Sequence, residues 1–230
     1  MKLSFFQENK SNILPYDGYT SYIPNFIKNT NSSFLHQLLN EVAWKHDELT
    51  LYGKKIITKR QVAFEGYEHI AYTYSKQEKI ASPWSNIVLE LKQKLEKELN
   101  TQFNGCLLNL YATGEIWMAW HSDNEPELES EGIIASLSFG ATRTFQLKHK
   151  QSGEKIELKL ENGSLLVMDM QSQQHWMHQL KKEPKILEPR INLTFRQFKK
   201  WGVEIGLKNV EKGVFIHYFL KDWYALMSVF

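Results

Sequence analysis

Residues 133–149 read IIASLSFGATRTFQLKH, and this stretch carries the pattern that decides the fold. Apolar and polar side chains alternate along residues 133–139 and again along residues 143–149, as they do in strands with one buried face. Gly140 stands between the two runs, where the chain needs a turn. The stretch therefore predicts two consecutive β-strands joined by a short connection.

The same two-residue period extends in both directions, from about residue 105 to residue 198. Eight strand-like runs are expected there: 106–111, 116–121, 133–139, 143–149, 155–160, 164–169, 175–180 and 190–198. Many short strands separated by turn residues are typical of a β-sandwich or a jelly roll. We therefore expect a mostly β core at about residues 105–198.

Two helices are expected before this core, at residues 33–44 and 83–100, because apolar side chains recur there at helical spacing. Ser82 is expected to cap the second helix, with Pro83 in its first turn. Both helices can buttress one sheet. The fold class is therefore expected to be mostly β with flanking α.

The other segments are less regular. Residues 52–80 are polar and aromatic with weak strand signals, and residues 201–230 are aromatic-rich without a clean period. We expect residues 1–200 to form a single domain, followed by a C-terminal tail of unknown role at residues 201–230.

The composition is that of an ordinary globular protein, with 230 residues, 42% hydrophobic residues and a net charge of +2. No apolar run is long enough to span a membrane, and the first residues lack the apolar segment of a signal peptide. Cys106 is the single cysteine, which excludes an internal disulfide and the cysteine ligands of a zinc deaminase. A cytoplasmic monomer is expected.

Three basic clusters could contact nucleic-acid phosphates or could simply be solvated faces. They are Lys54, Lys55, Lys59 and Arg60; then Lys148, His149 and Lys150; and then Lys181, Lys182 and Lys185.

A metal site is indicated by His121-Ser122-Asp123, which ends a strand-like run. Residues i and i+2 of a strand point to the same face, so His121 and Asp123 can bind one ion. A third ligand can come from His178 or from His175, which would face opposite sides of one strand. Two histidines and one carboxylate with open positions opposite form the arrangement that suits non-haem Fe(II). Alternatively, His178 is a rim histidine bonded to backbone.

The last strand-like run, RINLTFR at residues 190–196, has an unusual polar face. Alternation places Ile191, Leu193 and Phe195 on one face, and Arg190, Asn192, Thr194 and Arg196 on the other. Asn109 and Tyr111 likewise share a face of another strand. Because arginine binds carboxylates with a planar fork, a dicarboxylate could join the iron to Arg190. Alternatively, this face is a charged surface exposed to solvent.

Together these motifs resemble the AlkB family of Fe(II)- and 2-oxoglutarate-dependent dioxygenases, and most of all its DNA-repair branch. The resemblance covers about residues 50–198 and rests on Asn109-x-Tyr111, His121-x-Asp123-Asn124-Glu125, Ala135 to Gly140, His178 and Arg190-x-Asn192-Leu193-Thr194-Phe195-Arg196. In that family the iron-binding histidine precedes the arginine by about a dozen residues, which favours His178 over His175. The fold implied is a double-stranded β-helix, or jelly roll.

The resemblance also implies roles for individual residues. Iron would be bound by His121, Asp123 and His178. The cosubstrate 2-oxoglutarate would be bound by Asn109, Tyr111, Arg190, Asn192 and Arg196, and O₂ would be the second cosubstrate. A nucleotide-recognition lid at about residues 50–80 would bring Tyr72, Tyr74 and Ser75 to the substrate, with Glu125 facing the base.

The activity implied is oxidative demethylation of 1-methyladenine and 3-methylcytosine in DNA, coupled to decarboxylation of 2-oxoglutarate. Alkylated DNA would then be the partner. The alternatives are the same chemistry on RNA or on a substrate that is not a nucleic acid. A further alternative, of another class, is a jelly-roll binding module that has lost its metal.

Overall fold

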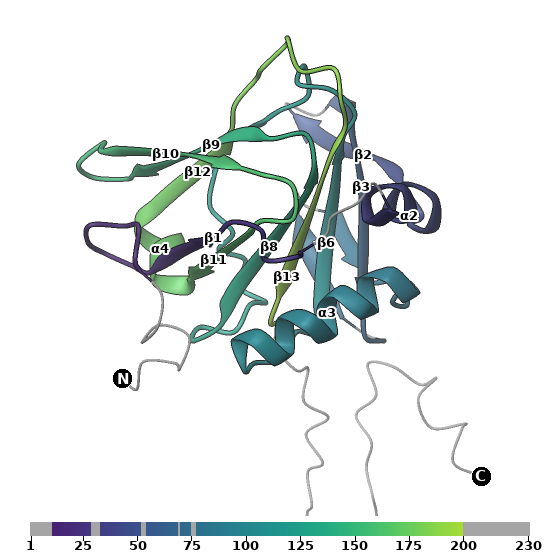
Figure 1. The fold of residues 1–230 in the computed structure, drawn as a ribbon, viewed down its shortest axis with the longest axis horizontal. Coiled ribbons are helices and arrows are strands. Elements are labelled where there is room, and N and C mark those ends of the chain that lie inside the picture. Colours follow the sequence, from purple (N-terminus) through teal and green to yellow (C-terminus); the bar gives the residue numbers. More distant parts are fainter. Residues whose placement is uncertain (1–10, 29–32, 52–53, 69, 75–76, 200–230) are drawn as a thin grey trace, which may run out of the picture. The chain divides into compact units, whose positions relative to one another are not determined.

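The structure, a computed structural model, describes residues 11–28, 33–51, 54–68, 70–74 and 77–199. Within these ranges the strands form a large sheet, a smaller sheet and a separate hairpin (Figure 1). The large sheet runs in the order β1 (Thr20–Ile23), β11 (Leu165–Asp169), β8 (Ile133–Gly140), β13 (Arg190–Arg196), β6 (Gly105–Tyr111), β3 (Lys54–Gly66) and β2 (Lys45–Leu51). The smaller sheet runs in the order β10 (Lys155–Leu160), β9 (Arg143–His149), β12 (Trp176–Leu180) and β7 (Met118–His121).

The hairpin consists of β4 (Ala71–Tyr74) and β5 (Gln77–Ile80). Every pair of neighbouring strands in the described ranges is antiparallel. All eight predicted runs are strands, with ends that differ from the prediction by at most two residues. The predicted jelly-roll fold is therefore confirmed.

Two helices, α2 (Ser33–Glu41) and α3 (Asn86–Leu99), cover one face of the large sheet (Figure 1). The apolar stripe of α3, including Leu91 and Leu95, packs in one buried cluster with Leu193 and Phe195 of β13. A second apolar cluster lies between the sheets and includes Phe145 of β9. The apolar face of β13 is thus directed at the helices, which leaves its polar face for the space between the sheets.

The predicted start of the second helix was wrong. α3 begins at Asn86, and Ser85 rather than Ser82 is its N-cap. The carboxylate of Glu65 accepts hydrogen bonds from the backbone N–H and the hydroxyl of Ser85, at 2.9 and 3.0 Å. Ser82 is instead bonded to the carbonyl of Phe64 through its own N–H and hydroxyl. Pairing with β3 therefore holds residue 82 in extended backbone, and a residue from a distant strand replaces the local cap.

Residues 45–51 and 54–66 form two strands. The first was not expected, and the second lies in the segment 52–80, where the pattern shows only weak strand signals. The expected helix at residues 33–44 ends at Glu41, and β2 begins at Lys45. β3 pairs with β6 from Gln61 to Gly66 and so joins the large sheet. Several side chains of β3 line a cavity rather than the apolar core, so the apolar alternation expected of a buried strand is weak here.

A further helix, α4 (Met170–His175), lies between β11 and β12. Asp169 caps it, because its carboxylate accepts a hydrogen bond of 2.7 Å from the backbone N–H of Ser172. The sequence pattern predicts His175 as the first residue of a strand, and this prediction is wrong. His175 is the last residue of a helix. No helix in the described residues is long and apolar enough to cross a membrane.

A buried arginine fixes the connections at one end of the smaller sheet. Arg143 is fully buried, and its Nη2 donates to the carbonyl oxygens of Lys181 and Ile116, at 2.7 and 2.9 Å. Glu183 lies 3.4 Å from Arg143 Nε and accepts hydrogen bonds from the N–H and hydroxyl of Thr144, at 2.8 and 2.6 Å. These contacts hold the segment that leads from β12 to β13.

We expect Glu183→Ala to lower the free energy of unfolding by about 2–3 kcal/mol, because the Arg143 charge and the Thr144 N–H would lose their partner. Urea denaturation measures this change. Glu188→Ala is the matched control, since Glu188 lies on the same connection but is exposed. Equal losses in the two variants would contradict the role given to Glu183.

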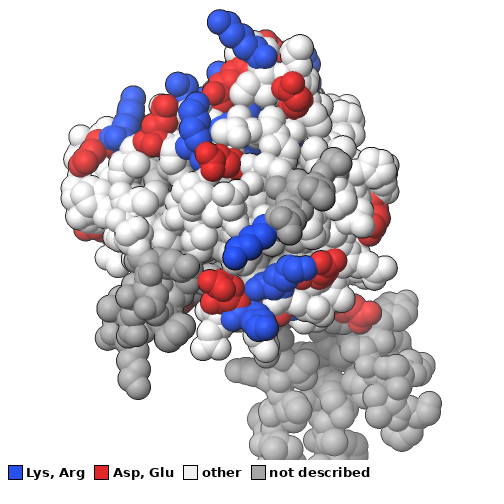
Figure 2. All heavy atoms as spheres, viewed as in Figure 1, with Lys and Arg blue, Asp and Glu red and all other residues white. Residues whose placement is uncertain are grey.

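Several described residues of the basic clusters are paired or buried. Lys182 lies 2.7 Å from Glu115, and Lys181 lies 3.7 Å from Glu157. Arg60, expected with the surface lysines, is only 6% exposed. Figure 2 shows Lys and Arg interspersed with Asp and Glu over the face drawn. Because Lys181 and Lys182 pair with glutamates, the expectation of a solvated face fits them better than that of a phosphate site.

The predicted tail at residues 201–230 lies outside the described residues. The single-domain boundary at residue 200 therefore stays a prediction.

Candidate metal and cosubstrate site

A cavity of about 710 Å³ is lined by side chains from both sheets. The large sheet contributes the polar face of β13 and the side chains of Asn109 and Tyr111 on β6. The smaller sheet contributes His121 and His178. All eight residues predicted for iron and for 2-oxoglutarate therefore line one cavity, because the two sheets turn their polar inner positions toward each other.

The three predicted metal ligands lie together in this cavity. β7 and β12 pair so that His121 is directly opposite His178, and the two ring centroids are 4.2 Å apart. Asp123 follows β7, with its Oδ1 3.7 Å from His121 Nε2. One ligand atom from each of the three residues lies within 4.8 Å of those of the other two. This spacing suits a single bound ion.

The hydrogen bonds of the two histidines fit a metal site. His121 Nδ1 donates to the carbonyl of Ala119 at 2.8 Å, which leaves the lone pair of Nε2 free for a metal. The ring of His178 stacks on Phe145, with centroids 5.3 Å apart. His178 Nδ1 is buried and has no hydrogen-bond partner among the described residues. A purely structural histidine bonded to backbone, the alternative raised by the sequence, does not match this geometry.

The charges of the site favour metal binding as well. Burial opposes ionisation of Asp123, but Arg196 and the two histidines outweigh it and hold the pKa of Asp123 below its usual value. Burial, helped by the nearby His121, lowers the pKa of His178 to about 3. A carboxylate and a neutral imidazole are the forms that bind a metal. Both are present at neutral pH before any ion arrives.

Gln173 is a site residue that the sequence did not reveal. It is 1% exposed on α4, and its Oε1 accepts a hydrogen bond of 3.0 Å from the backbone N–H of Asp123. Its Nε2 is held by Ser172 Oγ at 3.2 Å. Ser122 is tied to the same region, because its hydroxyl donates to the carbonyl of Trp176. α4 thus fixes the backbone that carries the carboxylate ligand. An amide 50 residues from Asp123 gives no sequence signal for this contact.

Gln173→Met should weaken metal binding by about 10- to 100-fold, as is typical when a residue that orients a ligand is lost. The measurement is the dissociation constant for Fe(II) under anaerobic conditions. Gln174→Met is the matched control, because Gln174 is the next residue and is exposed. The positioning role would be ruled out by equal affinities in both variants and the wild type.

The opposite region of the cavity contains a buried cation. Arg190 is 1% exposed, and its Nη2 donates to Ser138 Oγ at 2.9 Å. Its guanidinium lies over the ring of Tyr111, 5.5 Å from the centroid. Burial lowers the pKa of Arg190 to about 10, so the side chain is still charged at neutral pH. No carboxylate in the described part of the chain pairs with it, and its Nε has no partner there. The guanidinium group of Arg190 is therefore available to bind an anionic ligand.

Asn109 and Asn192 face each other across β6 and β13 beside Arg190. Asn109 Oδ1 is buried without a partner among the described residues. Asn192 Nδ2 already donates to Ser136 Oγ and to the carbonyl of Leu137, at 2.8 and 3.0 Å. The amide donor of Asn192 is thus already used within the protein. A carboxylate ligand would be bound by Asn109 Nδ2, because Oδ1 is an acceptor.

Arg196 differs from Arg190 although both belong to the same face of β13. Arg196 Nη2 lies 2.8 Å from Asp123 Oδ2, and its Nη1 lies 3.3 Å from Glu125 Oε1. Burial raises the pKa of Glu125, while Arg196 opposes this shift. Arg196 therefore links the metal ligand Asp123 to Glu125, and its charge is balanced by these carboxylates.

The predicted lid residues are only partly described. Lys79 and Ile80 of β5 line the cavity, so the hairpin formed by β4 and β5 borders it. The side chains of Tyr72 and Tyr74, and the whole of Ser75, lie outside the described residues. The buried Arg60 also lines the cavity, and its Nη1 lies 3.3 Å from Met118 Sδ. Arg60 therefore does not belong to a solvated basic cluster, which is one of the two expectations for residues 54–60.

Comparisons with known proteins agree with this site. A family model described as the 2OG-Fe(II) oxygenase superfamily matches residues 19–196. The human alpha-ketoglutarate-dependent dioxygenase alkB homolog 3 is 38% identical over 172 residues, covering 70% of this chain and 59% of that protein. The human DNA oxidative demethylase ALKBH2 is 33% identical over 188 residues, covering 77% of this chain and 72% of that protein.

A solved structure, that of OsALKBH1, has a TM-score of 0.52 at 17% identity. The likeness covers 77% of this chain and 96% of that one, and it shows a shared fold.

The chain therefore belongs to the 2OG-Fe(II) oxygenase superfamily and, within it, to the AlkB family. The cofactor of this family is Fe(II), and its cosubstrates are 2-oxoglutarate and O₂. The buried histidine nitrogen and the unneutralised guanidinium of Arg190 fit that pair of ligands. The chain spans less than two thirds of the alkB homolog 3 proteins, at 59% of the human and 64% of the bovine protein.

Proposed function

We propose that this chain demethylates N-alkylated bases in DNA, with 1-methyladenine and 3-methylcytosine as substrates, and thereby repairs alkylation damage. One observation carries the proposal. A single cavity contains a two-histidine, one-carboxylate cluster and a buried arginine that no described carboxylate neutralises. These features fit iron and a dicarboxylate cosubstrate in one place.

Different residues of the cavity would bind the iron and the cosubstrate. His121, Asp123 and His178 would hold the iron from one side and leave the opposite positions open. Arg190 would bind the distal carboxylate of 2-oxoglutarate, with Tyr111 and Asn109 beside it. Bound iron supplies the oxidising chemistry that couples decarboxylation of 2-oxoglutarate to attack on a methyl group. The protein supplies orientation and shields the cavity from bulk water.

Glu125 supports a cationic substrate. Both proposed bases carry a positive charge after methylation, and both are poorly paired, which makes it easier to flip them out of the helix. Glu125 Oε2 is buried without a partner among the described residues, whereas Oε1 contacts Arg196. Glu125 also lines the cavity, and a carboxylate there would favour the methylated cation over its neutral product.

DNA is proposed as the substrate because of the relatives. Proteins named DNA oxidative demethylase ALKBH2 are among them. Contacts from Tyr72, Tyr74 and Ser75 to the base, and a monomeric state, remain predictions.

The proposal is tested with purified, iron-loaded protein and 2-oxoglutarate on matched DNA and RNA oligonucleotides. Each set contains one 1-methyladenine, one 3-methylcytosine or the unmodified base. We expect formaldehyde release and base reversion on methylated DNA, and none with Asp123→Ala. Activity on RNA alone would overturn the DNA assignment. If 2-oxoglutarate is consumed on another substrate while neither nucleic acid releases formaldehyde, the demethylase proposal fails.

A further inference from the structure

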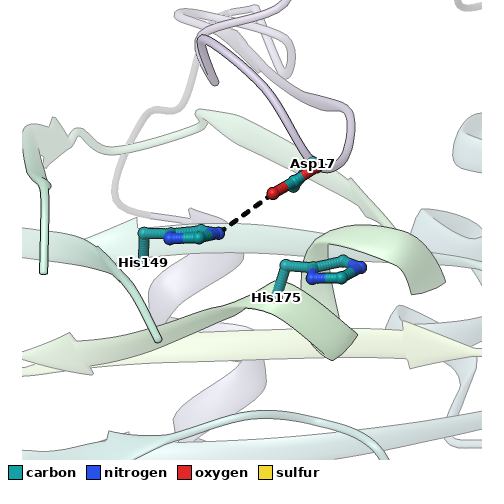
Figure 3. A group of neighbouring side chains, drawn as sticks. All are labelled: Asp17, His149 and His175. Atoms are coloured by element: carbon teal, nitrogen blue, oxygen red, sulfur yellow. Dashed lines mark hydrogen bonds and ion pairs between the residues drawn. The ribbon is translucent and has the colours of Figure 1, made fainter. Parts of the chain in front are cut away.

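A second group of metal-binding side chains lies outside the cavity, at Asp17, His149 and His175 (Figure 3). Asp17 belongs to the loop before β1, His149 is the last residue of β9, and His175 is the last residue of α4. One ligand atom from each residue lies within 4.8 Å of those of the other two. Three segments that are far apart in the sequence therefore meet with two imidazoles and one carboxylate.

His149 is fixed in place by its neighbours. It is 3% exposed, and its ring packs edge-on against Tyr16 and Trp176, with both centroid distances at 5.0 Å. The rings of His149 and His175 are nearly parallel, with an interplanar angle of 11° and centroids 6.4 Å apart. The backbone N–H of Lys150 also donates to the carbonyl of His175, which ties the ends of β9 and α4 together. The two histidines are therefore held side by side before any ligand binds.

Asp17 is positioned by an unusual turn. Its backbone φ is +53°, and Gly18 follows at +138°. A Cβ on Gly18 would lie 2.6 Å from the Cα of Ser172, so the turn packs directly on α4. A non-glycine residue adopts this left-handed conformation only at a cost, which packing must offset. The turn brings Asp17 Oδ2 to 3.2 Å from His149 Nε2 (Figure 3).

In the metal-free chain, His149 carries its ring proton on Nε2. The backbone N–H of Ser152 donates to His149 Nδ1 at 3.0 Å, and Nε2 donates to Asp17 Oδ2 at 3.2 Å. A metal bound to Nε2 would shift the proton to Nδ1, where the Ser152 hydroxyl, 3.0 Å away, would accept it in place of the backbone contact. The side chain of Asp17 is 46% exposed, so solvent water can complete the coordination. Two imidazoles, one carboxylate and water form a ligand set that suits zinc.

We propose that Asp17, His149 and His175 bind one Zn²⁺ ion, separate from the iron site of the cavity. The ion clips the loop before β1 onto β9 and α4. It stabilises the folded chain because the three ligands come together only when these segments pack. α4 also carries Gln173, which accepts a hydrogen bond from the backbone N–H of Asp123. Bound zinc would therefore also stabilise the position of α4, on which the iron site depends.

The test must separate the two sites, because the iron ligands also bind zinc. His178→Ala removes the iron site, and zinc bound to this protein is measured by equilibrium dialysis and elemental analysis. We expect one tight site in His178→Ala. Adding His175→Gln should weaken it about tenfold or more, since the loss of a direct ligand costs at least as much as that of an outer partner. Adding His36→Gln, the matched control at an exposed histidine of α2, should change nothing.

Asp17→Asn separates a metal site from a simple hydrogen bond. Asparagine keeps an oxygen that accepts a proton from His149 Nε2, but it is a poorer zinc ligand than a carboxylate. Zinc should raise the Tm of His178→Ala, and this rise should be lost with Asp17→Asn or His175→Gln. In the otherwise wild-type chain, zinc stoichiometry should fall from two to one with His175→Gln.

The proposal is overturned if His178→Ala binds no zinc, or if His175→Gln and His36→Gln bind it equally in that background. If His178→Ala does not fold, the stoichiometry in the wild-type background decides the question. Failure of this proposal leaves the demethylase proposal intact, because that test uses only the cavity.

Discussion

The Asp123→Ala protein is expected to lose Fe(II) binding by more than about 100-fold and to have no measurable 2-oxoglutarate turnover. Losing an outer partner of a metal ligand already costs about 10- to 100-fold, and Asp123 is a direct ligand in the proposed site. The substitution weakens metal binding in two ways. The carboxylate oxygen disappears, and Arg196 is left beside the two histidines without its closest negative partner.

The fold should survive this substitution. Arg196 keeps its contact with Glu125, so its charge is not left without a counterion. The thermal unfolding midpoint and circular dichroism of Asp123→Ala check this point. Asn124→Ala is the matched control for iron affinity, because Asn124 is the next residue and is exposed. A folded Asp123→Ala protein with wild-type turnover would rule out the proposed triad.

Arg190→Lys is expected to raise the apparent KM for 2-oxoglutarate by about 10- to 100-fold. A hydrogen bond to a charged group contributes about 1.5–3 kcal/mol, and lysine cannot reproduce the second bond of the guanidinium fork. The buried position strengthens the argument, because bulk water is a poor substitute partner at 1% exposure. Iron affinity should be unchanged, since His121 and His178 lie on strands of the smaller sheet and Asp123 follows β7.

Ser138→Ala serves as the matched control for Arg190→Lys. It removes the hydroxyl that accepts from Arg190 Nη2 but keeps the guanidinium, so a smaller rise in KM is expected. Direct titration of 2-oxoglutarate with Mn²⁺-loaded protein provides a second measurement that does not depend on turnover. An unchanged affinity in Arg190→Lys by both measurements would show that Arg190 does not hold the carboxylate.

The sequence by itself determined the eight strands between residues 105 and 198 and the direction in which the side chains of the last of them face. The period of two in RINLTFR places Arg190 and Arg196 on the face opposite to Leu193, and the structure has that arrangement. This prediction is correct because a strand directs alternate side chains to opposite faces. The local alternation of apolar and polar residues therefore shows which side chains are buried against the helices and which face the other sheet. The number of such runs indicates a sandwich or a jelly roll, and the resemblance to the AlkB family selects the jelly roll.

Only the tertiary structure decided how these strands meet. His121 and His178 lie directly opposite each other only because β7 pairs with β12, and these strands are more than 50 residues apart in the sequence. Sequence patterns assigned His175 to a strand, whereas the Asp169 cap makes it the end of α4 and places it beside His149. Contacts from Gln173 to Asp123 and from Glu65 to Ser85 likewise join distant segments. Local periodicity cannot encode such contacts, because they exist only once the sheets and helices have packed together.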